Sequence, residues 1–322
     1  MPKKPIYRFV QGDEYIDDIV RNKQLWLAEP IIPIGGRVNV YGQPKKARKS
    51  YLMLGLSHAI STGQPSWLGF PIKKSGPVLY LQADTPDPLW AQRMRDLRSA
   101  GYDMDEMWVA SLATMPYPFN INEHEEILNG MITAVPGEPV MIVFDTGAAM
   151  HTMNENQSQD MTVFIQALDR VAGKQARVLI THDRKGGFEK PEAESEEDDR
   201  EGGDLMRGSR GSSALAGAVD TVIKVSPKGT MYYQGRAVGE EHKKLRFLHA
   251  HNDQHPCPHP SPRQCMAWLW HEDLDEDVVE AKRLIELYKN GSERSLARQL
   301  AKRRGMPEET ARSVIRRQKE KL

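Results

Sequence analysis

The sequence predicts an α/β protein with a mostly parallel sheet, followed by a small all-α region at the C-terminus. Short apolar runs recur along the chain up to residue 181, and segments with helical spacing separate them. Strands that are apolar throughout and alternate with helices are typical of a parallel sheet covered on both faces. A length of 322 residues is sufficient for one large core and a small second domain.

The parallel sheet is expected to contain five strands connected by helical segments. The strand candidates are residues 37–41, 77–82, 108–111, 140–144 and 177–181. The helical segments are residues 50–61, 88–100, 123–134 and 160–173. Parallel strands need such crossover helices, because a tight turn can join only antiparallel neighbours.

The pattern changes after residue 206. Residues 221–226, 230–233, 245–250 and 266–270 look like successive strands, which we expect to extend the sheet as antiparallel edge strands. Residues 273–277 read as a linker into three helices at 278–290, 293–304 and 307–321. The sequence therefore predicts one domain over residues 1–272 and a helical, helix-turn-helix-like domain over residues 273–322.

The net charge is zero, but the charges are unevenly distributed. Residues 189–204 contain nine acidic and two basic side chains, whereas residues 281–322 contain thirteen Lys or Arg and five Glu. We expect a disordered acidic loop over residues 187–206 and a basic C-terminal module.

The sequence also indicates where in the cell the protein is expected. No apolar run approaches the roughly 20 residues that a membrane span needs, and the first residues show no secretory signal. Two cysteines make no disulfide framework, which fits a cytoplasmic protein. His251, His255, Cys257, His259 and Cys265 lack the repeated ligand pairs of a structural zinc site, so residues 251–265 are expected to be a proline-rich loop.

The stretch VYGQPKKARKSYLML, residues 40–54, has the outline of a phosphate-binding P-loop, G-x-x-x-x-G-K-[ST]. It follows a strand candidate, turns at Gly42, and enters a helical segment after Lys49 and Ser50. The gap from Gly42 to Lys49 is one residue longer than the motif allows. Arg48 also stands in place of the second glycine, which accepts backbone angles that arginine resists. The alternative interpretation is a basic surface turn.

A P-loop surrounds phosphates with backbone N–H groups and a helix N-terminus, while its lysine reaches the outer phosphates and its hydroxyl ligates magnesium. We therefore expect ATP and Mg²⁺ as ligands. The residues expected to line the nucleotide are Gly42, Gln43, Pro44, Lys45, Lys46, Ala47, Arg48, Lys49, Ser50 and Tyr51.

Two acidic residues follow other strand candidates. Asp145 ends the run MIVFD and, with Ser50, is the expected magnesium ligand. Asp84 ends the run VLYLQAD; the alternative interpretation is a cap for the helix entered at residues 86–88. Ligands bind at the carboxyl ends of parallel strands, so Lys49, Asp84 and Asp145 are expected to face one crevice.

Five segments in this order resemble the RecA-like P-loop ATPases, most closely the RepA-type hexameric replicative helicases of plasmids, phages and mobile elements, an AAA-type group. The resemblance covers about residues 25–226, and its five segments read IIPIGGRVNVYGQPKKARKSYLML, GPVLYLQADTPDPLWAQRMRDL, VMIVFDTGAAMHTMNENQSQD, VLITHDRKG and RGSRGSSALAGAVDTVIKV. The resemblance implies a RecA-like core, ATP hydrolysis with Mg²⁺, and a homo-hexameric ring that binds single-stranded DNA.

The resemblance also implies a role for each matching residue. Lys49 and Ser50 match the P-loop pair, and Asp145 matches the acid of the magnesium site. Asp84 stands where the family has a catalytic glutamate that polarises the attacking water, and it is shorter by one methylene. His182 matches a residue that senses the γ-phosphate; a hydrogen-bonded structural histidine is the alternative.

Arg210, or Arg207 in a near-duplicate of its sequence, matches an arginine that reaches the nucleotide of the neighbouring subunit. Such a finger stabilises charge on the transferring phosphoryl group. The two arginines alternatively balance the acidic segment that precedes them.

DNA is expected to contact two parts of the chain. In RecA-like rings the loops after the magnesium-site strand and after the histidine strand face the channel, here residues 146–159 and 184–206. The acidic residues of the second loop would repel phosphates, which leaves Arg184 and Lys185. Residues 295–322 have the spacing of a helix-turn-helix that binds duplex DNA, with expected contacts at Thr310, Arg312, Arg316 and Arg317. A charged helical bundle for oligomer contacts is the alternative.

The sequence thus favours an ATP-hydrolysing RecA-fold motor that acts on DNA, of the replicative helicase type. One alternative is a DNA-binding regulator or replication loader that uses ATP as a switch and unwinds little. A small-molecule P-loop kinase is another, but it does not explain the helix-turn-helix-like tail.

Overall fold

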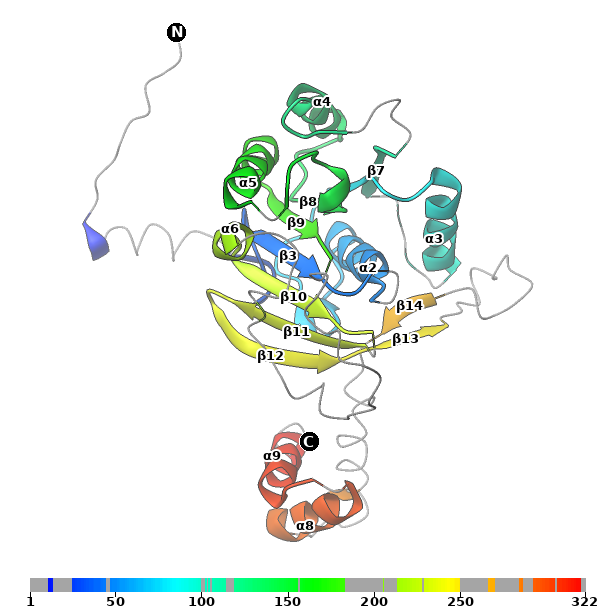
Figure 1. Cartoon of the computed structure of the whole chain (residues 1–322). Helices are drawn as coiled ribbons and strands as arrows, with labels where there is room; N and C mark the ends of the chain where they lie inside the picture. Colours follow the sequence, from blue (N-terminus) through cyan, green and yellow to red (C-terminus); the bar gives the residue numbers. More distant parts are fainter. Residues whose placement is uncertain are drawn as a thin grey trace, which may run out of the picture.

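The computed structural model describes residues 11–13, 25–44, 47–99, 102, 104, 106–113, 119–155, 157–182, 205, 213–227, 229–249, 266–269, 284–285, 292–304 and 306–319. Its centre is an eight-stranded sheet in the order β12-β11-β10-β3-β9-β8-β6-β7 (Figure 1). All neighbours from β10 to β7 run parallel, while β11 and β12 are antiparallel at one edge. The predicted α/β class with a mostly parallel sheet is confirmed.

The strands of the parallel part are short, and all except the edge strand β7 are almost entirely buried, as their apolar sequences predict. They are β3 (Arg37–Tyr41), β6 (Val78–Gln82), β7 (Met107–Ser111), β8 (Met141–Asp145), β9 (Ala176–Ile180) and β10 (Thr221–Val225). No end of these strands differs from its predicted bound by more than one residue.

Helices cover both faces of this sheet. They are α2 (Lys49–Ser61), α3 (Asp87–Ser99), α4 (Glu125–Ala134), α5 (Ser158–Ala172) and the short α6 (Ser213–Ala218), with a 3₁₀ turn, η1, at Gly147–Ala149. Alternate residues of a strand point to opposite faces. Tyr80 accordingly packs with α2 and α3 in one core layer, whereas Leu79 and Leu81 pack with α4 and α5 in the other.

The edge strands differ in part from the prediction. β11 (Thr230–Gly235) and β12 (Val238–Lys244) extend the sheet, but β13 (Arg246–His249) and β14 (Met266–Leu269) pair only with each other among the described strands. The expectation that 245–250 and 266–270 join the large sheet is therefore wrong. The expectation that 221–226 is an antiparallel edge strand is wrong too, because β10 lies inside the sheet and runs parallel to β3. Strand β12, of sequence VGEEHKK, was not predicted because its mostly exposed side chains are charged or polar.

Two further pairs of short strands lie outside the large sheet. One is β1 (Trp26–Ala28) with β2 (Ile32–Pro33), and the other is β4 (Ser66–Trp67) with β5 (Phe70–Pro71). Neither pair was predicted, because strands of two or three residues carry too little sequence for any periodicity.

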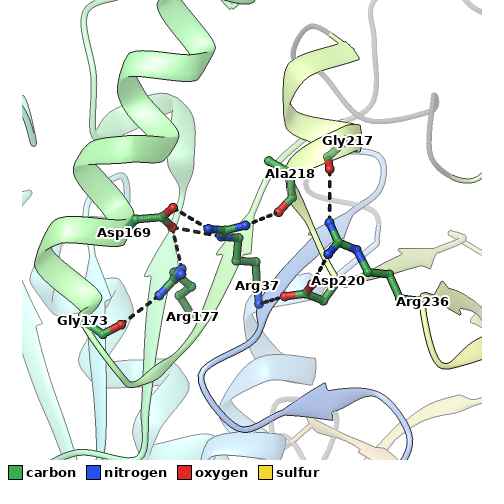
Figure 2. A network of polar contacts seen from close by, with 8 residues as sticks. All are labelled: Arg37, Asp169, Gly173, Arg177, Gly217, Ala218, Asp220 and Arg236. Carbon is green, nitrogen blue, oxygen red and sulfur yellow. Dashed lines mark hydrogen bonds and ion pairs between the residues drawn. The ribbon is translucent and has the colours of Figure 1, made fainter. Parts of the chain in front are cut away.

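At the amino-terminal edge of the parallel strands, a network of ion pairs and hydrogen bonds links β3, β9 and α5 with the residue that precedes β10 (Figure 2). Arg37 at the start of β3 binds both carboxylate oxygens of Asp169 on α5, at 3.1 and 2.7 Å. Arg177 of β9 is 2.9 Å from the same carboxylate. Asp220 accepts from the Arg37 backbone N–H at 2.8 Å and pairs with Arg236 at 3.4 Å.

The C-terminal helices α8 (Glu293–Arg304) and α9 (Glu308–Lys319) pack on each other, close to their predicted bounds. Their shared core contains Leu296, Leu300 and Ile315. Of the predicted helix 278–290 only Leu284 and Ile285 are described, and both are helical and buried. Within the described residues, no helix is long and apolar enough to cross a membrane.

Candidate nucleotide site

The register of the sheet brings the ends of four parallel strands to one edge. Asp145 of β8 lies opposite Gln82 of β6 and Ile180 of β9, and Ile180 lies opposite Val40 of β3. The segments that follow these strands, which include the P-loop, Asp84 and His182, therefore meet at the carboxyl edge. This is where ligands bind in open α/β sheets.

Gly42 begins the P-loop, and its lack of a side chain is required there. A Cβ atom at this position would lie 2.4 Å from the backbone oxygen of Val225 and 2.9 Å from the Cβ of Ala47. The loop can therefore turn tightly against β10 only with glycine. Lys45 and Lys46, which were expected to line the nucleotide, are outside the described residues.

Arg48 explains how the loop does without its second glycine. Its backbone has φ 51° and ψ 37°, which is the left-handed conformation, and it lies at the cap position of α2. An L-residue other than glycine adopts this conformation at a cost of about 1 kcal/mol. The loop thus keeps the backbone shape that the motif's glycine provides, with an exposed arginine in it.

Lys49 starts α2 and is only 6% exposed. Its Nζ donates to the backbone oxygen of Gly42 at 2.8 Å and lies 3.4 Å from that of Gln43. The Nδ1 atom of His182 is also 3.4 Å from Nζ. The lysine is therefore held over the loop, beside the histidine that follows β9.

Asp145 is 1% exposed, and its Oδ2 accepts a hydrogen bond of 2.8 Å from the Tyr80 hydroxyl. Burial raises the pKa of Asp145 to about 6, against the lowering effect of the neighbouring Ser50 and Tyr80 hydroxyls. The negative charge of Asp84 raises this pKa further. The surroundings of Asp145 thus disfavour the ionised form of its carboxylate, the form that a metal ligand requires.

The donor set around Asp145 fits Mg²⁺. Its Oδ1 atom is buried and makes no hydrogen bond within the described part of the chain. The hydroxyl of Ser50, one residue after the P-loop lysine, lies close enough to lower the pKa of this carboxylate. A carboxylate oxygen and a P-loop hydroxyl, completed by phosphates and water, are the ligands that Mg²⁺ takes in nucleotide sites.

Asp84 lies two residues beyond β6 and is exposed. The Thr85 hydroxyl donates to its Oδ1 at 3.0 Å, and its charge acts on Asp145. Helix α3 begins only at Asp87, so Asp84 is too far from that helix to cap it. The position leaves the Asp84 carboxylate near that of Asp145.

Tyr80, Gln82 and Arg93 belong to this edge but were missed in the sequence. Tyr80 and Gln82 are polar-tipped residues inside an apolar strand, which is the one signal that marks them. The Gln82 amide binds Asp87 at 3.1 Å and also Ser111, and its oxygen accepts from the backbone N–H of Thr85 at 3.2 Å. Gln82 thereby fixes the turn that carries Asp84.

Arg93 lies on α3 and turns toward the same edge. It donates to the Thr85 hydroxyl at 3.3 Å, and its guanidinium lies over the rings of Trp90 and Tyr51 at 5.6 and 5.9 Å. Its positive charge lowers the pKa of Asp145. No sequence motif marks it, because only the packing of α3 against α2 brings it there.

Several predicted site residues cannot be placed. Arg184, Lys185, Arg207, Arg210 and the side chain of Arg317 lie outside the described part of the chain, as do the five histidines and cysteines of residues 251–265. On α9, Thr310, Arg312 and Arg316 are exposed.

Comparison with known families decides the class of this site. A family model described as an AAA domain matches residues 14–187, which is more than half of the chain and includes the P-loop, Asp84, Asp145 and His182. The chain belongs to this AAA domain family. Together with the geometry of the carboxyl edge, the match confirms a RecA-like P-loop ATPase domain.

Solved structures also resemble the chain at low identity. A DnaB-like replicative helicase, determined with its interactions with primase, shares 9% identity and a TM-score of 0.46 over 67% of this chain and 57% of that one. A KaiC-like protein from the hyperthermophilic archaeon Pyrococcus horikoshii OT3 shares 12% identity and a TM-score of 0.44 over 76% and 93%. The chain thus spans little more than half of the helicase. No curated protein matches the sequence.

Proposed function

We propose that the protein is an ATP-hydrolysing motor that acts on DNA, of the RepA-type replicative helicase kind. The observation that carries this proposal is the convergence of Lys49, His182, Asp145 and Asp84 at the carboxyl edge of one parallel sheet. A basic surface turn would not need a buried lysine, nor a buried acid with an unused oxygen beside a hydroxyl.

Each residue has a proposed task in hydrolysis. Lys49, released from the Gly42 oxygen, neutralises the β- and γ-phosphates held by the loop N–H groups. Asp84 orients the attacking water and accepts its proton, as a general base does. His182, 3.4 Å from Lys49, has the proposed task of sensing whether the γ-phosphate is present.

Mg²⁺ would be held by Ser50 and Asp145. When bound, it neutralises charge on the β- and γ-phosphate oxygens. Tyr80 keeps one oxygen of Asp145 engaged through a 2.8 Å hydrogen bond, which leaves the other free for the ion. Gln82 and Thr85 hold the turn that carries Asp84.

Completion of the site by a neighbouring subunit is part of the proposal. Arg207 or Arg210, just before α6, would reach the nucleotide of the next subunit in a homo-hexameric ring. Single-stranded DNA would pass through that ring near Arg184 and Lys185. The C-terminal helices, as a separate domain after residue 272, would hold duplex DNA.

The second candidate is an ATP-binding regulator or replication loader with little unwinding activity. Asp84 favours it, because an aspartate is one methylene shorter than the glutamate of the family and reaches less far toward the water. This candidate predicts tight nucleotide binding with negligible turnover.

The test is phosphate release from ATP by the full chain with Mg²⁺, compared with Lys49→Ala. We expect turnover in the wild type and a loss of at least about 100-fold in the variant, because a group that stabilises the transition state is removed. Lys74→Ala, which removes an exposed lysine elsewhere, is the matched control. Turnover that survives in Lys49→Ala would rule out the P-loop mechanism.

A further inference from the structure

Glu293, the first residue of α8, reaches across to α9. Its Oε1 atom lies 2.9 Å from Nε of Arg312 and 3.7 Å from Nε of Arg316. The side chains are 30%, 54% and 61% exposed, respectively. One carboxylate thus serves two arginines at the surface of the helical pair.

These arginines belong to a basic stripe on α9. Arg312, Arg316 and Lys319 are spaced i, i+4 and i+7, which places them on one face of the helix over about 10 Å. The hydrogen bond from Arg312 lowers the pKa of Glu293, and the charges of Arg316 and Lys319 lower it further. Arg312 and Arg316 therefore converge on the Glu293 carboxylate, and Lys319 follows on the same face of α9.

The position that the Glu293 carboxylate occupies beside these arginines can also accommodate a phosphate group. Arginine forks bind carboxylate and phosphate in the same way, through charge-assisted N–H···O bonds. Ion pairs between exposed side chains are worth about 0.2 to 1 kcal/mol, so a polyanion can displace the carboxylate. A nucleic-acid strand offers a charge about every 3.4 Å of helix axis, and a stripe of this length can meet several of them.

We propose that the stripe of Arg312, Arg316 and Lys319 binds the phosphate backbone of duplex DNA, and that Glu293 occupies this site intramolecularly and weakens the binding. The proposal rests on the duplex-binding role proposed above for the C-terminal helices. Glu293 then acts as an intramolecular competitor, which keeps the affinity for duplex DNA low.

A second ion pair supplies a matched control. Arg298 of α8 lies 3.2 Å from Glu308 of α9, with both side chains exposed. Glu308→Gln removes one negative charge and one interhelical ion pair, as Glu293→Gln does, but leaves the stripe covered. Any difference between the two variants therefore reports on the stripe itself.

The experiment is titration of a labelled duplex with the full chain, across a range of salt concentrations, for the wild type and three variants. The variants are Glu293→Gln, Glu308→Gln and the double variant Arg312→Gln/Arg316→Gln. We expect Glu293→Gln to bind about fivefold more tightly than Glu308→Gln, as the release of a surface ion pair allows. Its affinity should also fall more steeply with salt, because more phosphates are neutralised. The double variant should bind more weakly than the wild type.

The outcomes separate this inference from the proposed function. If duplex binding depends on Arg312 and Arg316 but Glu293→Gln behaves like Glu308→Gln, the competitor role is overturned and the duplex-binding role stands. If no variant binds duplex DNA, both fall. Glu293→Ala repeats the test with a smaller side chain, and an unchanged far-UV circular dichroism spectrum of each variant confirms that it is folded.

Discussion

At the scale of single residues, Asp145 shows a conflict between function and stability. The carboxylate is buried, and its pKa in the folded protein is raised from 3.8 to about 6. The folded state therefore holds a proton between these values that the unfolded state has released. The contribution of this group to the free energy of unfolding is therefore largest below about pH 4. It decreases as the pH rises toward 6 and is lost at higher pH.

We predict that Asp145→Asn stabilises the nucleotide-free protein at pH 7.5 by up to about 3 kcal/mol, since two pKa units correspond to about that much. Asparagine still accepts the Tyr80 hydrogen bond. The gain, measured by urea unfolding, should shrink toward pH 4, where the wild-type carboxylate is protonated. ATP turnover should be lost at the same time. A variant less stable than the wild type at pH 7.5 would contradict this account of the site.

Arg48 provides a second prediction at this scale. Its left-handed backbone, with φ 51°, favours glycine over any residue with a Cβ atom. Arg48→Gly should therefore be more stable than Arg48→Ala by about 1 kcal/mol, as the cost of the left-handed conformation implies. Both variants lose the same charge, so thermal or urea unfolding isolates the backbone effect. Equal stabilities would mean that this backbone angle is relaxed in solution.

The single residues also show what the sequence can predict. Lys49, Ser50 and Asp145 follow apolar strands in a recognisable order, and local sequence was sufficient to place them at one edge. Tyr80 and Arg93 reach Asp145 from other elements, so only the three-dimensional packing identifies them. Arg48 was expected to oppose the loop shape, whereas the structure has it adopting the left-handed angle.

At the scale of the elements, the amino-terminal edge of the sheet depends on one shared carboxylate. Asp169 on α5 binds Arg37 of β3 in a bidentate pair and also pairs with Arg177 of β9 (Figure 2). Arg177 is 9% exposed, and burial lowers its pKa while Asp169 opposes that change. Without Asp169, two guanidinium groups would face each other with less compensation.

We predict that Asp169→Asn lowers the free energy of unfolding by about 2 to 3 kcal/mol, because it leaves a largely buried arginine unpaired. The control is Glu125→Gln, which breaks an exposed pair with Arg170 on the same helix α5 and should cost under about 1 kcal/mol. Equal losses in the two variants would show that the network adds nothing beyond a surface pair.

The same scale explains the errors in the predicted sheet. The alternation of apolar runs with helices was sufficient to predict five of the six parallel strands. Strand β10 was expected at an antiparallel edge, because no helix separates it from the strands that follow, whereas it runs parallel to β3 inside the sheet. Strand β12 pairs through its backbone while its side chains face solvent, so no hydrophobic pattern marks it. Strands β13 and β14 pair with each other, and the sequence of neither strand indicates which strand it pairs with.

At the scale of the whole molecule, the fold separates the proposed tasks. The carboxyl edge gathers the nucleotide residues, the opposite edge carries the Asp169 network, and α8 with α9 has a small core of its own. The family match covers the nucleotide part only.

The most direct test is the rate of ATP hydrolysis with and without single-stranded DNA, with Lys49→Ala as the control. A DNA-driven motor predicts a rate that rises severalfold with single-stranded DNA and is abolished by the substitution. Tight ATP binding with a negligible rate that DNA leaves unchanged would contradict the motor and favour the ATP-dependent regulator.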